Sequence, residues 1–244
     1  MKRVLLIQGS HPEARKLFRQ ALRKQTTFAG SDLFDSMTIR LRGKYVVSVG
    51  RLQNWIPFEG IIHFELPYRV YWEYHTRQIN MRSLHAINAY DGKIFRSIHN
   101  GWIHEENDQA QKLENIRKKI WALSALLLST LNEHYYSLAY VDKHTLLINH
   151  LIYGDYLRLS LRDDQSLFSS SITLSRAEEE EIFTVCASKE SIHFPQVILP
   201  KTIETYWGKS PTMLLEPYAV HMNPTFDPAL FRLEAYHPIY RAQA

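Results

Sequence analysis

The sequence predicts an α+β fold in which a strongly curved antiparallel sheet is accompanied by two helices. Three observations predict it. Apolar residues recur at helical spacing in only two stretches, one near the N-terminus and one in the middle of the chain. Elsewhere, apolar and polar residues alternate with the period of two that is typical of strands. Asp91-Gly92 and Asn100-Gly101 separate alternating segments, which indicates antiparallel hairpins.

The length and composition favour one globular domain. A chain of 244 residues with 45% hydrophobic and 22% charged residues can bury a sizeable core. The low counts of 9 Gly and 10 Pro exclude a collagen-like or low-complexity chain. Cys186 is the single cysteine, which excludes an intramolecular disulfide and a multi-cysteine zinc site. We see no linker rich in Gly or Ser and therefore expect one domain over residues 1–244.

The first helix is predicted to begin at Ser10 and to end near Lys24. Ser10 and Glu13 have the spacing of a capping box, and Pro12 suits the first helical turn. Apolar residues then follow at helical spacing: Ala14, Leu17, Phe18, Ala21 and Leu22. A second, longer helix is predicted over residues 107–133. Its apolar stripe consists of Leu113, Ile116, Ile120, Leu123, Leu127 and Thr130.

The strands are predicted in two groups, one on each side of the central helix. Gly43-Lys44 is expected to interrupt the first group, and Trp55-Ile56-Pro57-Phe58 is expected to form an apolar, mobile loop. The predicted strands are 37–42, 45–47, 61–66, 68–75, 78–82, 85–90 and 94–99, followed by 138–140, 145–150, 156–161, 167–174, 181–186, 192–198, 202–207 and 213–221.

The positive charge is concentrated at the N-terminus. Residues 1–51 contain eleven Lys and Arg against three acids, a net charge of +8. Since the whole chain carries +4, the remainder carries −4. Such a region could meet an anionic membrane surface, an acidic partner or nucleic acid, or could form a solvated helix face.

No catalytic or metal-binding motif stands out. His104 and Glu105 lack the second histidine of a helical zinc-protease site, and there is no nucleophile elbow, phosphate-binding loop or dinucleotide fingerprint. Cys186 lies inside a predicted strand and is interpreted as a core thiol. The histidines show no tight ligand spacing, so no metal site, cofactor or enzymatic activity is predicted; they include His63, His75, His85, His99, His104, His134, His144 and His150.

The chain resembles the LolA/LolB-like superfamily, the bacterial periplasmic carriers and outer-membrane receptors of lipoproteins. Four segments carry the resemblance over nearly the full length. They are an entry helix followed by a strand ending in Arg42-Gly43, the hairpin Tyr90-Asp91-Gly92-Lys93, the stretch 194–203, and the closing stretch 222–231. The chain differs from LolB-type receptors because it has no N-terminal cysteine for a lipid anchor.

The resemblance implies an incomplete, half-open β-barrel of about eleven strands, with helices forming a lid or plug and an interior that holds acyl chains. Larger barrels of this kind enclose a ligand rather than only their own side chains. The expected ligand-binding residues come from strands, from the apolar segment near Pro57 and from the central helix: Trp55, Phe58, Phe64, Tyr71, Ile87, Phe95, Ile116, Ile120, Leu123 and Leu127.

The first functional hypothesis is therefore a non-enzymatic carrier of lipid or acylated lipoprotein in the bacterial cell envelope. Envelope transport proteins or an anionic membrane surface are the expected partners of the basic N-terminal region. The resemblance implies a periplasmic or outer-membrane location. The apolar stretch after Lys2-Arg3 is shorter than a signal-peptide core, which leaves a cytoplasmic location open.

The alternative hypothesis is a basic, β-rich module that binds nucleic acid or an acidic protein. It rests on four basic residues with nearby aromatic side chains, a combination typical of single-strand binding surfaces. These residues are Arg40, Arg42, Lys44, Arg51, Tyr45 and Trp55.

The carrier hypothesis generates a test in the central helix. Leu123→Glu or Leu127→Glu would place a charge among acyl chains and should abolish uptake of a fluorescent fatty-acid probe, while circular dichroism should still report a folded sheet. Normal probe binding by both folded variants would contradict the assignment of this helix to the ligand cavity.

Overall fold

A computed structural model describes residues 10–25, 35–49, 52–65, 68–76, 84–99, 102–106, 110–126, 136–176, 179–195 and 197–234. The chain divides into two compact units. Unit 1 comprises Met1–Leu33 and Ala122–Ser210, and unit 2 comprises Phe34–Trp121 and Pro211–Ala244. Because each unit is made of two separate stretches, neither is a continuous piece of chain. The expectation of one domain over the whole chain stays a prediction.

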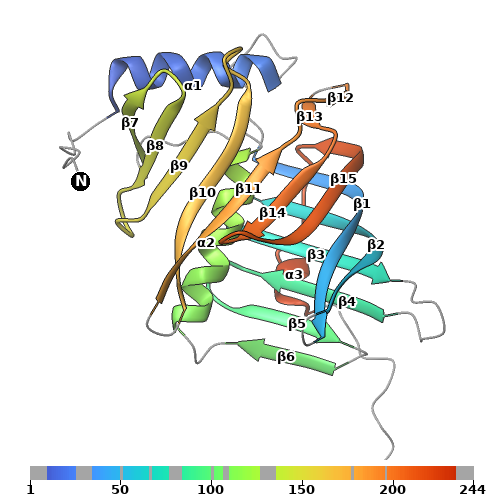
Figure 1. The fold of residues 1–244 in the computed structure, drawn as a ribbon. Coiled ribbons are helices and arrows are strands. Elements are labelled where there is room, and N and C mark those ends of the chain that lie inside the picture. Colours follow the sequence, from blue (N-terminus) through green and yellow to red (C-terminus); the bar gives the residue numbers. More distant parts are fainter. Residues whose placement is uncertain are drawn as a thin grey trace, which may run out of the picture. The chain divides into compact units, whose positions relative to one another are not determined.

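Unit 2 is built on an antiparallel sheet with the strand order β6-β5-β4-β3-β2-β1-β15 (Figure 1). The short helix α3 (Ala229–Arg232) contacts β3 and β4, and α2 (Ala110–Leu126) begins in this unit. The strands are β1 (Ser36–Val49), β2 (Leu52–Glu65), β3 (Arg69–Thr76), β4 (Leu84–Tyr90), β5 (Phe95–His99), β6 (Trp102–Glu106) and β15 (Ser210–Met222).

Unit 1 contains α1 (Pro12–Gln25) and a second group of antiparallel strands in the order β14-β11-β10-β9-β8-β7. The backbone N–H of His11 donates to the carbonyl of Leu138 at 2.8 Å, which ties the start of α1 to β7. The strands are β7 (Tyr136–Asp142), β8 (Thr145–His150), β9 (Tyr156–Leu161), β10 (Leu167–Arg176), β11 (Glu179–Ala187) and β14 (Ile203–Trp207), with β12 (Ser191–His193) and β13 (Ile198–Pro200) forming a separate pair.

The predicted α+β class with an antiparallel sheet is confirmed. The described ranges contain more strands than the eleven or so that the resemblance to the LolA/LolB-like superfamily implies. Strand β6 is not among the strands predicted from the sequence. It pairs with β5 from His99 opposite Trp102 to Phe95 opposite Glu106. Asn100-Gly101, the predicted turn between these two strands, lies outside the described residues.

Helix α1 carries the predicted apolar stripe, but its N-terminus is capped differently. Ala14, Leu17, Phe18 and Ala21 are buried, and exposed basic residues occupy the opposite face. The expected pairing of Ser10 with Glu13 is not formed. The Ser10 hydroxyl accepts from the N–H of Leu138 at 3.1 Å, and the N–H of Glu13 donates to His11 Nδ1 at 3.2 Å. A tertiary contact thus replaces the local capping box.

Two local interpretations of the first strands are wrong. Gly43-Lys44 does not interrupt a strand but lies within β1, and Trp55-Ile56-Pro57-Phe58 is not a loop but part of β2. Pro57 is compatible with a strand here because it lies past the β2 residues that pair with the described part of β3. Phe58 is the last of these, so the described residues give Pro57 a neighbouring strand on one side only. A missing N–H is tolerated at such an edge.

Close packing explains why position 43 is a glycine. Gly43 pairs with Phe58, and a Cβ atom at position 43 would lie 2.7 Å from the Phe58 ring and 2.5 Å from the carbonyl oxygen of Leu214. Both separations are shorter than real side chains allow. The absence of a side chain at Gly43 therefore lets the Phe58 ring lie over β1, where it is only 4% exposed.

The Asp91-Gly92 turn between β4 and β5 is confirmed. The Asp91 carboxylate accepts hydrogen bonds from the N–H groups of Lys93 at 2.9 Å and Ile94 at 2.8 Å, and from Arg96 at 3.2 Å. Gly92 has φ +96°, which a residue with a side chain rarely adopts. Burial alone would raise the pKa of Asp91, but these donors outweigh it and hold the pKa below its ordinary value.

Within the described residues, none of the helices combines the length and the apolar character that crossing a membrane requires.

We expect Phe58→Ala and Trp55→Ala, two substitutions on the same strand, to differ strongly in stability. Loss of the buried Phe58 ring should lower the free energy of unfolding by about 3–5 kcal/mol. Trp55 is 44% exposed, and its loss should cost less than about 1 kcal/mol. Urea denaturation of each variant measures both values, and equal losses would contradict the packing described for Gly43 and Phe58.

The Asp91 turn predicts a pH-dependent contribution to stability. A carboxylate whose pKa is lowered in the folded state stabilises the protein above its unfolded pKa and loses that contribution as pH falls through the folded pKa. The stability difference between wild type and Asp91→Ala should therefore be largest near neutral pH and shrink below about pH 4. Denaturation of both proteins across this range checks it. Asp163→Ala is the control, because the Asp163 side chain is 99% exposed. If the stability difference between wild type and Asp91→Ala does not shrink in acid, the role assigned to Asp91 is wrong.

Candidate functional site

The strands of unit 2 present two chemically different faces. Because successive side chains of a strand point to opposite sides, the β1–β2–β3 pairing assigns each residue to one face. We call the first the aromatic face, formed by Tyr45, Phe58, Ile62, Phe64, Trp72 and Tyr74. We call the second the charged face, formed by Arg40, Arg42, Lys44, Glu59, Glu73, His75 and His85.

Four rings on the aromatic face form a cluster around Phe58. The centroid of the Phe58 ring lies 5.6 Å from that of Tyr74, 6.0 Å from that of Tyr45 and 6.1 Å from that of Trp72. These separations are typical of tilted and edge-to-face aromatic pairs. Phe58 is buried, whereas Tyr45, Trp72 and Tyr74 are half-buried. The cluster therefore has a closed base and rings that remain partly accessible.

The surroundings of these rings are weakly polar. Burial raises the pKa of both Tyr45 and Tyr74, because a phenolate loses hydration there. In the described part of the chain, the indole Nε1 of Trp72 is buried and has no hydrogen-bond partner. Such an environment favours an apolar ligand group over a charged one.

The ten residues expected to bind a ligand do not all lie on the same face of the sheet. Phe58 and Phe64 are buried on the aromatic face, and the pairing of Phe95 with Tyr90 places Phe95 there too. Tyr71 and Ile87 lie on the opposite face, where they pack against Phe231 and Leu233. These two groups cannot line one surface of the sheet, because its backbone separates them.

The remaining expected residues lie on the β1–β2 hairpin and the central helix. Trp55 is exposed, on the part of β2 that is not paired with the described residues of β3. On α2, Ile120 is buried while Ile116 and Leu123 are half-buried. Leu127 lies outside the described residues. Tyr45, Trp72 and Tyr74 also lie on the aromatic face but were not among the ten expected residues; the alternation of Trp72 and Tyr74 with polar residues indicates their shared face.

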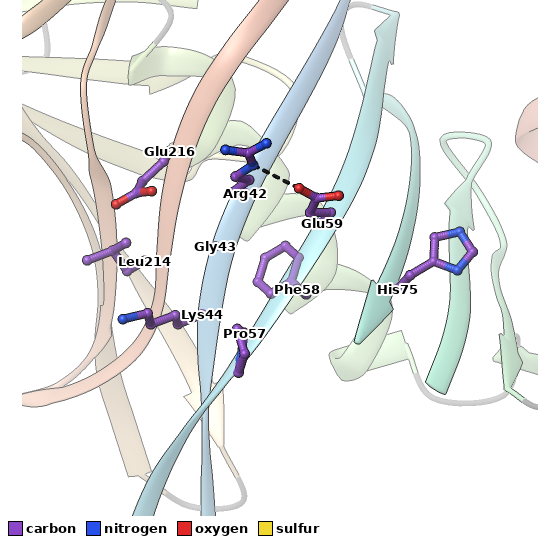
Figure 2. Close-up of a pocket in the computed structure, with 9 residues that line it drawn as sticks. All are labelled: Arg42, Gly43, Lys44, Pro57, Phe58, Glu59, His75, Leu214 and Glu216. Atoms are coloured by element: carbon purple, nitrogen blue, oxygen red, sulfur yellow. Dashed lines mark hydrogen bonds and ion pairs between the residues drawn. The ribbon is translucent and has the colours of Figure 1, made fainter. Parts of the chain in front are cut away.

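The charged face is hollowed by two neighbouring pockets. The larger, of 670 Å³, is lined mainly by residues of β15, β1 and β2 and includes the ion pair in which Arg42 Nε lies 2.8 Å from Glu59 Oε1 (Figure 2). The second, of 510 Å³, extends towards α3 and includes Tyr71, Glu73 and Leu230. Glu59 and His75 line both pockets, so the two adjoin, and together we call them the groove.

A cluster of titratable side chains lies at this groove, which Glu73 and His75 line and which His85 adjoins through its pairing with His75. Glu73 and His75 lie two residues apart on β3, and His85 pairs directly with His75 from β4. The three side chains offer ligand atoms that all lie within 4.8 Å of one another. In the sequence, the histidines show no tight ligand spacing, and no metal site was predicted. The Glu73-x-His75 spacing was a usable signal, but the third member depends on strand pairing.

Glu73 is ionised and tightly hydrogen-bonded. Its Oε1 lies 2.9 Å from His85 Nε2, and its Oε2 accepts from the Tyr71 hydroxyl at 2.8 Å. Burial by itself would raise the pKa of Glu73, but these hydrogen bonds, together with the nearby His75, hold the pKa below its ordinary value.

The basic strand expected for a nucleic-acid-binding module is partly neutralised. Arg40, Arg42 and Lys44 do share the charged face, whereas Tyr45 points to the other side. Arg42 pairs with Glu59 and lies opposite Glu216 on β15, and its guanidinium stands 5.3 Å from the Tyr218 ring centroid. Arg51 lies outside the described residues. Acids thus alternate with the bases across this surface.

Cys186 lies in β11 and is half-buried. Burial and the nearby Glu204 raise the pKa of its thiol, although Arg162 opposes them. The thiol is therefore protonated at neutral pH, which is unfavourable for a nucleophile.

Comparison with known proteins gives matches at the level of structure. No family model matches the sequence, and no curated protein matches it. A LolA superfamily protein from Nitrosomonas europaea matches with a TM-score of 0.50 and 8% identity over 89% of this chain and 96% of that chain. A DUF1329 family protein from Desulfovibrio piger matches with a TM-score of 0.52 and 9% identity over 91% of this chain and 98% of that chain.

At such low sequence identity, these similarities concern the fold alone. They nevertheless extend over about nine-tenths of this chain and nearly the whole of each matched chain. The predicted resemblance to the LolA/LolB-like superfamily is thereby confirmed as a resemblance of fold: the chain has an α+β, LolA-like fold.

Proposed function

We propose that this protein binds the acyl chains of a lipid or an acylated lipoprotein in the bacterial cell envelope and catalyses no reaction. The observation that carries the proposal is the aromatic face, where three half-buried rings surround the buried Phe58. The similarity of fold to a LolA superfamily protein supports it.

The physical argument is the hydrophobic effect. An acyl chain laid along Tyr45, Trp72 and Tyr74 would remove apolar surface from water without requiring a polar partner. Each buried methylene contributes about 0.8 kcal/mol, so a stretch of six contributes about 5 kcal/mol before the costs of binding. The proposed contact surface comprises the aromatic face, with Phe95 at its β5 end.

The N-terminal helix supplies a second contact in this proposal. Four basic side chains of α1 are exposed, while its apolar stripe is buried: Lys16, Arg19, Arg23 and Lys24. A cationic helix surface favours an anionic membrane or an acidic envelope transport protein as partner. A periplasmic or outer-membrane-associated location follows from the proposed cargo.

The proposal predicts a specific loss in Trp72→Ala. Removing about 50 Å² of apolar contact costs about 1.3 kcal/mol, which corresponds to roughly tenfold weaker binding of a fluorescent fatty-acid probe. Fluorescence anisotropy measures the affinity. Tyr218→Ala is the matched control, because Tyr218 is an exposed aromatic residue on β15 that stacks with Arg42 on the charged face. The Tyr218→Ala variant should bind the probe as tightly as the wild type.

Native mass spectrometry of the purified protein, followed by organic extraction, identifies the cargo. A lipid or acylated peptide bound at near-stoichiometric amount is expected. The proposal is wrong if no lipid is found and the wild type also fails to bind the probe, or if a folded Trp72→Ala variant binds the probe as tightly as the wild type.

A further inference from the structure

The titratable cluster of the charged face has the composition of a metal site. Glu73 and His75 lie on β3 two residues apart and therefore on the same side of the sheet, and His85 reaches the same point from β4. Two imidazoles and one carboxylate are the ligand set used by Zn²⁺ and by several other divalent transition metals.

The geometry of the three ligand atoms is convergent. Glu73 Oε1 lies 2.9 Å from His85 Nε2 and 3.4 Å from His75 Nε2. The two imidazole rings are stacked with centroids 4.2 Å apart and planes inclined by 8°, and the ligand atoms of all three side chains lie within 4.8 Å of one another. Metal–ligand bonds of about 2.0–2.2 Å in a tetrahedral site place ligand atoms about 3.3–3.6 Å apart. The distance from Glu73 Oε1 to His85 Nε2 would therefore have to lengthen only slightly for an ion to fit between the three side chains.

The surroundings fix the carboxylate and leave the site accessible. Tyr71 donates to Glu73 Oε2 at 2.8 Å, which orients the carboxylate and leaves Oε1 directed at the histidines. Tyr71 is itself held in the cluster beneath α3. Such outer hydrogen bonds orient ligands in known metal sites. The side chains of His75 and His85 are 58% and 40% exposed, so an ion could enter from the groove.

The neighbouring histidine has a different role. His63 Nδ1 lies 2.8 Å from the Thr38 hydroxyl, and its ring packs against those of Tyr71 and Phe226. His63 is not among the side chains whose ligand atoms converge; within the described part of the chain these are Glu73, His75 and His85, one atom each. A tetrahedral ion held by three protein ligands keeps one position for water or for an anionic group of a ligand.

We propose that Glu73, His75 and His85 bind one divalent transition-metal ion of the Zn²⁺ class. This proposal does not depend on the proposed lipid binding, because the cluster lies on the opposite face of the sheet from Trp72.

The test uses the untagged full-length protein after treatment with a chelator and its removal. Isothermal titration with Zn²⁺ should give one site per chain, and Co²⁺ should give the visible absorption bands of a tetrahedral centre. His75→Ala and His85→Ala should each weaken binding by at least about tenfold, because each removes a ligand. Tyr71→Phe keeps the ring in the core and should weaken binding by about 10-fold through loss of the orienting hydrogen bond.

The chain offers a matched control. His144 Nε2 lies 3.5 Å from Asp163 Oδ1 in unit 1, a histidine–carboxylate pair for which the described residues provide no third ligand. His144→Ala should leave Zn²⁺ affinity unchanged. His85→Gln, with circular dichroism, separates loss of a ligand from loss of the fold. The proposal is overturned if the wild type binds no Zn²⁺, or if binding survives either histidine substitution in a folded protein.

Discussion

The antiparallel register between β1 and β2 is the constraint on which both faces of unit 2 depend. Each residue from Ser36 to Val49 pairs with one residue of β2, without a bulge. A slip of one residue would transfer every side chain of a strand to the opposite face. Gly43 opposes such a slip because it is the position that accommodates the Phe58 ring. Its neighbours Arg42 and Lys44 carry side chains that could not take this place.

This register separates two chemistries across the thickness of one sheet. Tyr45, Trp72 and Tyr74 share the weakly polar side, where burial raises the pKa of the tyrosines. Arg42 and Glu59 share the other side, where their ion pair is largely exposed to solvent. An apolar ligand and a metal ion need opposite surroundings. Binding of an apolar ligand is favoured when its surface is removed from water, whereas a metal ion needs charged ligands. The alternation of a strand provides both within a few residues.

The residues that follow β15 pack against part of the charged face. After β15 the chain returns over the sheet, and Phe231 and Leu233 pack against Tyr71 and Ile87. This packing buries the Tyr71 ring while its hydroxyl still reaches Glu73. Tyr71 was expected in an acyl-binding cavity. In the structure it joins a small apolar core to a polar cluster, a combination that suits an amphipathic tyrosine side chain.

The type and order of most elements can be predicted from the sequence, because periodicity and turn chemistry are local. The apolar stripe of α1 and the Asp91-Gly92 hairpin are examples, and the resemblance to the LolA/LolB-like fold came from the same local patterns in order. Strand pairing in the folded chain is needed to establish that Pro57 belongs to a strand, that Phe58 and Tyr71 point apart, and that His85 lies beside His75. These outcomes depend on which strands pair and in which register. Pairing between residues distant in sequence is set by packing of the whole sheet rather than by the neighbours of each residue along the chain.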